Sequence, residues 1–139
     1  MPWHDSAVER TYSTPLLDKL GVRPGARVGI IGVEDRVFHD LLGTRTSDVI
    51  MGSPSGDADL IFLAAGTVEH LFALRELRSR IVPNGAIWVV SRKGKAATIR
   101  DVDVMAAAKS AGLVDNKVVS FSDTHTALRL VIPRADRPR

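Results

Sequence analysis

The sequence of 139 residues contains no cysteine. This absence excludes disulfide bonds, thiolate nucleophiles, cysteine-bound zinc and iron–sulfur clusters. A chain of this length buries roughly 68–70% of the surface that its unfolded form exposes, so it needs no such crosslink to fold. The missing cysteines fit a reducing compartment, and no basic region followed by an apolar run stands at the amino terminus. We therefore expect a cytoplasmic protein.

Aromatic residues make up only 5% of the chain, and its apolar runs are too short to cross a bilayer. Basic and aromatic residues do not alternate as they do in proteins that stack nucleic-acid bases. The four histidines show no spacing typical of a zinc motif. No Gly-x-Ser-x-Gly motif presents a nucleophilic serine. The sequence thus predicts no membrane segment, no metal site and no catalytic residue.

The formal net charge is +3, and most of it lies at the carboxyl terminus. Residues 134–139 hold three arginines and one aspartate, which gives +2 there and +1 for the rest of the chain. So short a cluster attracts nucleic acid weakly at physiological salt, and nucleic acid is not the expected partner. The length predicts a single domain over residues 1–139, with an ordered core at about 11–133 and flexible tails at 1–10 and 134–139.

Short apolar runs rich in β-branched residues alternate with segments of helical spacing, and glycine or proline separates them. This alternation predicts an α/β fold, with a mostly parallel sheet and helices on both faces. Strands are expected at residues 27–31, 48–51, 59–64, 86–90, 117–121 and 126–132, and helices at 14–20, 34–43, 67–81 and 98–111. The turn between the last two strands has hairpin length, so these strands form an antiparallel pair.

Three of the expected helices carry apolar residues on one face, and the helix at 98–111 is predicted to bury that face. The faces comprise Val37, Phe38, Leu41 and Leu42 in the helix at 34–43, Val68, Leu71, Leu74, Leu77 and Ile81 in the helix at 67–81, and Ile99, Val102, Met105 and Ala106 in the helix at 98–111. Trp88 lies in a fully apolar strand and is predicted to be a core residue.

Several phrases follow one another in a recognisable order: the apolar strand at 59–63, the amphipathic segment ending in Pro83-Asn84-Gly85, the strand around Trp88, and Ala111-Gly112-Leu113. In this order they resemble the carboxyl-terminal half of class I S-adenosylmethionine methyltransferases. Residues 16–28 are similar to the lead-in before the first strand of those enzymes. The resemblance implies a three-layer Rossmann-like fold with an antiparallel strand pair at its carboxyl-terminal end.

Four shorter phrases, at residues 12–16, 20–22, 112–118 and 122–123, resemble an uncharacterised bacterial family of short proteins that is classed as a domain of unknown function. This resemblance extends over about residues 11–133. It implies a shared fold and no particular activity, because a fold by itself does not determine a function.

The segment after the first predicted strand departs from the methyltransferase pattern. The enzymes place an acidic residue and a Gly-x-Gly-x-Gly run there, whereas here Gly32 is followed by Val33, Glu34 and Asp35. The two carboxylates would cap the next helix themselves and meet the carboxylate of a cofactor with like charge. The enzymes also place an acid for the ribose hydroxyls after the second strand, and residues 51–54 offer none. We therefore expect no cofactor, with S-adenosylmethionine disfavoured.

Only seven residues separate Met51 from Asp59, too few for a strand–helix pair that the full-length enzymes possess. The fold is therefore expected to be truncated, with the strand at 48–51 at the sheet edge. A short apolar edge invites pairing. We expect either coverage by the amino-terminal segment with Trp3 and Tyr12 or a homo-oligomer, a homodimer in the first instance.

Ligands of open α/β sheets bind beyond the carboxyl ends of the strands. The candidate residues there are Gly32, Glu34, Asp35, Gly66, Ser91, Arg92, Lys93 and Lys95. The three cations around Gly94 are suited to a phosphate or carboxylate, although loops of this kind are commonly mobile and solvated.

Three hypotheses about function follow. The leading one is a non-catalytic binding or regulatory module that acts through self-association or a protein partner. The alternative is a small ligand-binding protein or enzyme for a nucleotide or another anionic metabolite, S-adenosylmethionine included; as an enzyme it would be a methyltransferase-like transferase. The third is a nucleic-acid accessory protein that uses the loop at 91–95 and the arginine tail, with an affinity that falls steeply with salt.

Overall fold

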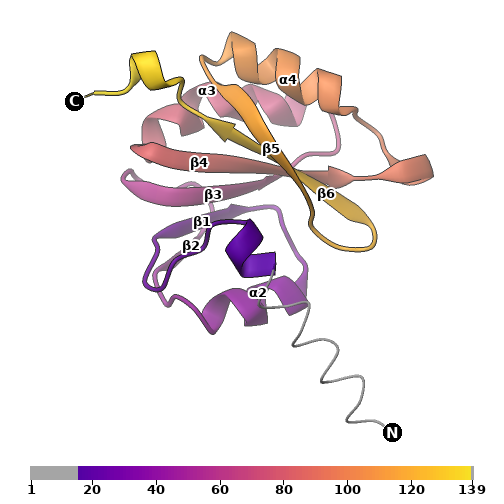
Figure 1. Cartoon of the computed structure of the whole chain (residues 1–139). Coiled ribbons are helices and arrows are strands. Elements are labelled where there is room, and N and C mark those ends of the chain that lie inside the picture. Colours follow the sequence, from indigo (N-terminus) through magenta and orange to yellow (C-terminus); the bar gives the residue numbers. More distant parts are fainter. Residues whose placement is uncertain (1–15, 139) are drawn as a thin grey trace, which may run out of the picture.

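The computed structural model describes residues 16–138 and contains one six-stranded sheet in the order β2-β1-β3-β4-β6-β5 (Figure 1). Strands β2, β1, β3 and β4 run parallel, and β6 is antiparallel to both β4 and β5. The strands are β1 (Val28–Ile31), β2 (Val49–Met51), β3 (Ala58–Ala64), β4 (Ile81–Arg92), β5 (Val114–Ser120) and β6 (His125–Val131). The predicted mostly parallel sheet with an antiparallel carboxyl-terminal pair is confirmed.

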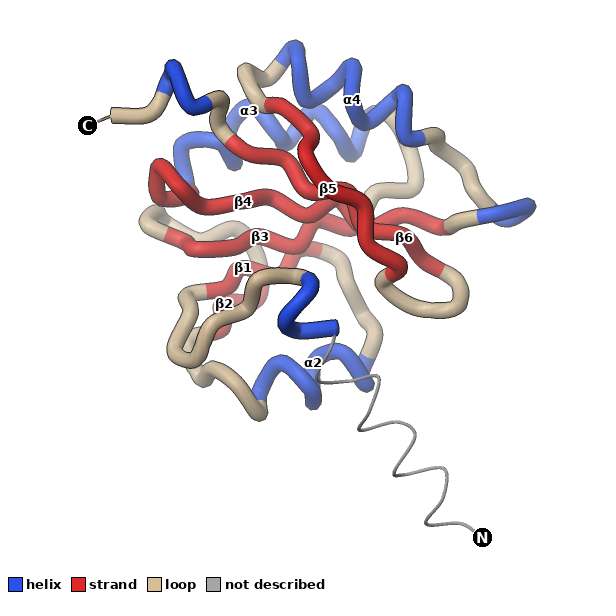
Figure 2. The backbone as a smooth tube through the Cα atoms, in the orientation of Figure 1, coloured by secondary structure: helices blue, strands red, loops and turns tan. Residues whose placement is uncertain are grey.

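Helices cover both faces of this sheet, which gives three layers (Figures 1 and 2). A helical turn at residues 16–19 and α2 (Arg36–Gly43) pack on one face. The segment η1 (Glu69–Ala73), α3 (Leu74–Leu77) and η2 (Arg78–Arg80) packs on the other face together with α4 (Asp101–Ser110). Two short 3-10 turns, η3 (Gly94–Ala96) and η4 (Arg134–Asp136), follow β4 and β6.

The central strand β4 shows why the sheet is apolar on both sides. Trp88 and Val90 face the cluster beneath α2, whereas Ile87 and Val89 face the cluster beneath α3 and α4, and all four are buried. Alternating side chains point to opposite faces of a strand, so a strand covered by helices on both sides reads as a continuous apolar run. Trp88 is a core residue as predicted, and its indole N–H donates to the Leu20 carbonyl at 3.0 Å.

The predicted continuous helix at 67–81 is wrong. The segment forms 3-10 turns at both ends around a single α-helical turn, and the strand β4 begins already at Ile81. Leu71, Leu74 and Leu77 are buried at a spacing of three, which matches the three residues per turn of a 3-10 helix. Apolar residues at this spacing therefore fit either helix type.

The predicted buried face of α4 is also wrong. Val104 and Ala108 are buried, whereas Val102 is 62% exposed and Met105 is 36% exposed. The helix begins at Asp101, three residues later than expected, after the amide of Arg100 donates to Asp103 Oδ2 at 2.8 Å. Ile99 is buried but precedes the helix, so its position does not set the phase of the helix.

Strand β2 lies at the sheet edge, as the short spacing before residue 59 predicts. Residues 52–57 lead from its end back to β3 without a helix. Pro54 of this loop packs over β1, where a Cβ on Gly29 would stand 2.8 Å from the proline Cδ. Arg80 holds the loop from the other side by donating to the Pro54 carbonyl at 3.3 Å. The amino-terminal segment that was expected to cover β2 lies outside the residues that the structure describes.

Candidate functional site

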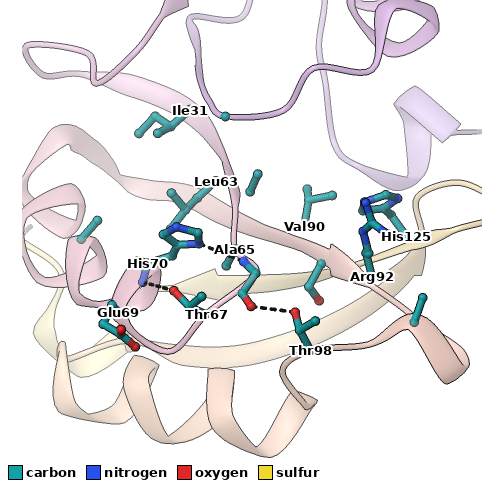
Figure 3. A pocket seen from close by; sticks show the side chains of 16 residues that line it. Ile31, Leu63, Ala65, Thr67, Glu69, His70, Val90, Arg92, Thr98 and His125 are labelled. Carbon is teal, nitrogen blue, oxygen red and sulfur yellow. Dashed lines mark hydrogen bonds between the residues drawn. The ribbon is translucent and has the colours of Figure 1, made fainter.

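Strands β1, β3 and β4 end at the same edge of the sheet, and a cavity of about 750 Å³ opens there (Figure 3). Its apolar floor comes from the last residues of the three strands, and its polar wall comes from the segments that follow β3 and β4. The lining residues are Ile31, Gly32, Leu63, Ala64, Ala65, Gly66, Thr67, Glu69, His70, Ala73, Val90, Ser91, Arg92, Ala96, Thr98 and His125. We name this cavity the crevice.

Gly32 forms the part of the crevice that follows β1. Its φ of 77° lies in the left-handed region, which side chains other than glycine adopt at a cost. A Cβ at this position would stand 3.3 Å from the Cβ of Ala64 on the neighbouring strand. Glycine therefore keeps the backbone bare at the point where a ligand would come closest to the sheet.

Hydrogen bonds fix His70 on the wall that follows β3. Its Nδ1 accepts from the amide of Gly66 at 2.9 Å, and its own amide donates to Thr67 Oγ1 at 3.3 Å. The Thr98 hydroxyl donates to the Gly66 carbonyl at 2.6 Å, which ties the same loop to the segment before α4. Because a backbone N–H donates to Nδ1, that nitrogen carries a lone pair and the ring proton lies on Nε2. His70 thereby offers a neutral N–H donor.

The other end of the crevice carries the positive charge. Arg92, the last residue of β4, is the cross-strand neighbour of His125 on β6, and Figure 3 shows their side chains next to each other. His125 Nδ1 lies 2.7 Å from Thr124 Oγ1. The carboxylate among the lining residues is Glu69, on the far side of His70 from Arg92 (Figure 3). The crevice thus has a cationic end at Arg92 and an end that carries the carboxylate of Glu69.

A second cavity of about 390 Å³ adjoins the crevice and shares Gly32, Ala64, Val90 and His125 with it. Glu34 and Asp35 form its acidic side. Asp35 caps α2 as predicted, because its Oδ1 accepts from the amide of Phe38 at 3.1 Å. The positive end of this helix is therefore already occupied by a carboxylate of the chain itself.

The structure brings together six of the eight candidate residues chosen from the sequence. Gly32, Gly66, Ser91 and Arg92 line the crevice, and Glu34 and Asp35 line the adjoining cavity. Lys93 and Lys95 line neither of them. Lys93 turns away, because its Nζ donates to Ser120 Oγ at 2.7 Å, and Lys95 lies exposed in η3.

Sequence reasoning missed His70, Thr98 and His125 as lining residues. In the sequence, His70 and His125 are marked only by the acidic and hydroxyl residues next to them, and this is a weak signal for a binding site. The position of His70 depends on the 3-10 turn that replaces the expected helix, and that of His125 depends on the register of the hairpin.

Within residues 16–138 the structure shows no group of three or more His, Asp or Glu side chains arranged to hold a metal ion. In the same part of the chain no helix has the length and apolar character needed to traverse a lipid bilayer.

Several solved structures with a similar arrangement are methyltransferases. A SAM dependent methyltransferase from Aquifex aeolicus aligns with a TM-score of 0.67 and 15% identity, over 86% of this chain and 89% of that one. The N-methyltransferase NodS from Bradyrhizobium japonicum WM9 aligns with a TM-score of 0.62 and 15% identity, over 94% and 99% of the two chains. The magnesium protoporphyrin IX methyltransferase ChlM from Synechocystis PCC 6803 aligns with a TM-score of 0.62 and 12% identity, over 89% of this chain and 83% of that one.

These similarities, together with the mixed six-stranded sheet, define the fold as a Rossmann-like, methyltransferase-like α/β fold. No curated protein matches the sequence. The chain belongs to the family DUF3052, described as a protein of unknown function, whose profile matches residues 18–134. The resemblance to a small family of unknown function is thereby confirmed.

Proposed function

We propose that this protein is a non-catalytic binding module that holds a small anionic ligand in the crevice. The observation that carries the proposal is that the Arg92 guanidinium and His70, whose ring proton lies on Nε2, both line the same cavity of about 750 Å³. A guanidinium and a neutral N–H donor both interact favourably with phosphate or carboxylate oxygens. Bare backbone at Gly32 leaves room for the ligand at the sheet edge of the same cavity.

Two features speak against a catalytic role with S-adenosylmethionine. Asp35 already caps α2, so the helix end that would attract the carboxylate of a cofactor carries a negative charge instead. The loop after β2 leads directly to β3 and supplies no acid for ribose hydroxyls, because Met51 is followed by Gly52, Ser53 and Pro54. These features favour a binding role over methyl transfer.

A thermal-shift screen of the full chain tests the proposal. The panel contains nucleotides, phosphorylated and carboxylated metabolites, S-adenosylmethionine and S-adenosylhomocysteine. A ligand at 100 times its Kd adds about 2.7 kcal/mol to the free energy of unfolding. We expect one class of anion to raise Tm, and we expect Arg92→Gln to abolish that rise. Lys109→Gln, which removes one positive charge from the exposed end of α4, should leave the rise unchanged.

The second candidate function is a minimal S-adenosylmethionine-binding enzyme. The left-handed Gly32 favours it, because the backbone after the first strand is where such enzymes bring the cofactor close. A rise in Tm with S-adenosylmethionine or S-adenosylhomocysteine, and with no other anion, would replace the binding module by this candidate. If no compound in the panel shifts Tm, both candidate functions are contradicted.

Self-association through β2 is part of the same proposal. The strand is an edge of three residues, and Met51 on it is 67% exposed. A second copy that pairs with this edge would satisfy its outward backbone groups. We expect a dimer in light scattering coupled to size exclusion, and a monomer for Met51→Lys, since a lysine on an edge strand opposes pairing. A wild-type protein that stays monomeric at high concentration, with freely exchanging amides at residues 48–51, would contradict this pairing.

A further inference from the structure

The opposite edge of the sheet, where β4 begins and β6 ends, carries a second polar cavity. It lies at the end of the molecule from which the carboxyl terminus leaves in Figure 1, and its volume is about 410 Å³. The lining residues are Gly21, Arg23, Pro24, Gly25, Ala26, Asp59, Leu60, Val82, Asn84, Gly85 and Arg129. We name it the amino-edge cavity. It shares no residue with the crevice.

Arg129 is the unusual residue of the amino-edge cavity. Its side chain is half-buried on β6, yet none of the ion pairs among residues 16–138 involves it. The hydrogen bond that its Nη1 makes to Asn116 Oδ1 is long, at 3.4 Å. Burial, and next the positive charge of Arg137, lower the pKa of Arg129 from its ordinary value. A half-buried guanidinium without a carboxylate is costly to maintain.

Cationic groups outnumber carboxylates around Arg129, and none of the ion pairs among residues 16–138 neutralises it. Lys117 is its cross-strand neighbour on β5, and its Nζ donates to the Lys19 carbonyl at 2.8 Å. Like charges directly opposite each other on adjacent strands are destabilising. Arg23 lines the cavity from the loop before β1. The carboxylate in the wall, Asp59, accepts at 2.8 Å from the amide of Arg27.

We propose that the amino-edge cavity binds the phosphate group of a small molecule, held by Arg129 and Arg23. A phosphate brings up to two negative charges and several acceptor oxygens, which suits a guanidinium pair with further cations close by. The cavity exceeds the size of a lone phosphate, so the ligand has room for a small organic group. This site is independent of the ligand proposed for the crevice.

The experiment uses inorganic pyrophosphate as the probe and the full chain as the protein. We expect titration calorimetry at low salt to show binding, and amide NMR to show shifts at residues 21–23, 25–26, 84–85 and 129. Arg129→Gln and Arg23→Gln should each weaken the affinity at least tenfold. Arg23 is exposed in a loop, so its variant reports on binding even if the Arg129 variant folds poorly. Lys109→Gln removes the same unit of charge elsewhere and should keep the wild-type affinity.

Without a ligand, Arg129→Met is expected to leave Tm unchanged or to raise it, because the variant removes an uncompensated charge and keeps the alkyl stem. A fall in Tm of several degrees would mean that Arg129 is a structural residue, and it would overturn the proposal. Amide shifts confined to residues 31–32 and 91–92 would overturn it as well. Binding of a single-stranded oligonucleotide without binding of pyrophosphate would assign the cluster to a nucleic-acid backbone instead.

Discussion

Trp88→Ala is expected to lower the free energy of unfolding by about 3–5 kcal/mol, the range for removing a large aromatic side chain from a core. Trp88 is 0% exposed and lies in the strand that pairs with both β3 and β6. The substitution removes the ring from the cluster beneath α2 and leaves the Leu20 carbonyl without the donor that it has at 3.0 Å. An orphaned buried acceptor adds to the cost of the cavity.

Urea denaturation followed by far-UV circular dichroism measures this loss. Trp88→Phe keeps part of the ring volume and loses only the N–H donor and one ring, so a smaller loss of about 1–3 kcal/mol is expected. Phe72→Ala is the matched control, because Phe72 is 73% exposed and its removal should change stability by no more than about 0.5 kcal/mol. Equal midpoints for Trp88→Ala and Phe72→Ala would contradict the central role of Trp88.

Gly85→Ala is expected to lower the free energy of unfolding by about 1–3 kcal/mol, the cost of overpacking a close contact. A Cβ on Gly85 would stand 2.9 Å from the Asp59 carbonyl oxygen and 3.1 Å from those of Ala58 and Val82. All three are backbone atoms, so relief requires β3 and β4 to separate and the first residues of β4 to deform, at the point where the register of the two strands shifts.

Gly43→Ala is the comparison for this variant. Gly43 ends α2, has no atom within 4 Å of an added Cβ, and does not have a positive φ. Alanine is the better helix former by about 0.5–1 kcal/mol, so the variant should be neutral or slightly stabilising. Thermal denaturation of both variants gives the test. A Gly85→Ala protein as stable as Gly43→Ala would show that the two strands yield without cost.

Most strands of the sheet could be predicted, because each is specified by residues adjacent to one another in the sequence. The segments before Gly32 and Gly66 are rich in apolar residues. The strand predicted for each segment agrees with the bounds of β1 or β3 to within one or two residues. The edge position of β2 follows from the short spacing between Met51 and Asp59, which leaves no room for another strand and helix. The helices were less predictable, since leucines spaced by three fit an α-helix and a 3-10 helix alike. The phase of α4 depended on the cap at Arg100, which periodicity does not reveal.

The location of the candidate site could be predicted from the sequence, but the side chains that line it could be predicted only in part. Strand ends identify Gly32, Gly66, Ser91 and Arg92, because parallel strands bring their carboxyl ends to one edge. His70 and His125 reach the same cavity through a turn type and a hairpin register that no short motif encodes. Lys93 directly follows Arg92, the last residue of β4, but its Nζ donates to Ser120 Oγ, a contact between residues 27 apart.

Strand β6, the last strand within residues 16–138, is an inner strand, flanked by β4 and β5. On the ribosome, β5 therefore has no neighbour to pair with until residues 125–131 have emerged, and β4 keeps one open side for as long. The sheet therefore closes only after β6 has been synthesised. Pairings between distant segments form slowly, and unpaired edges are prone to aggregation in the meantime. The topology thus makes the interval between the synthesis of β5 and that of β6 the stage at which the sheet is most prone to aggregation.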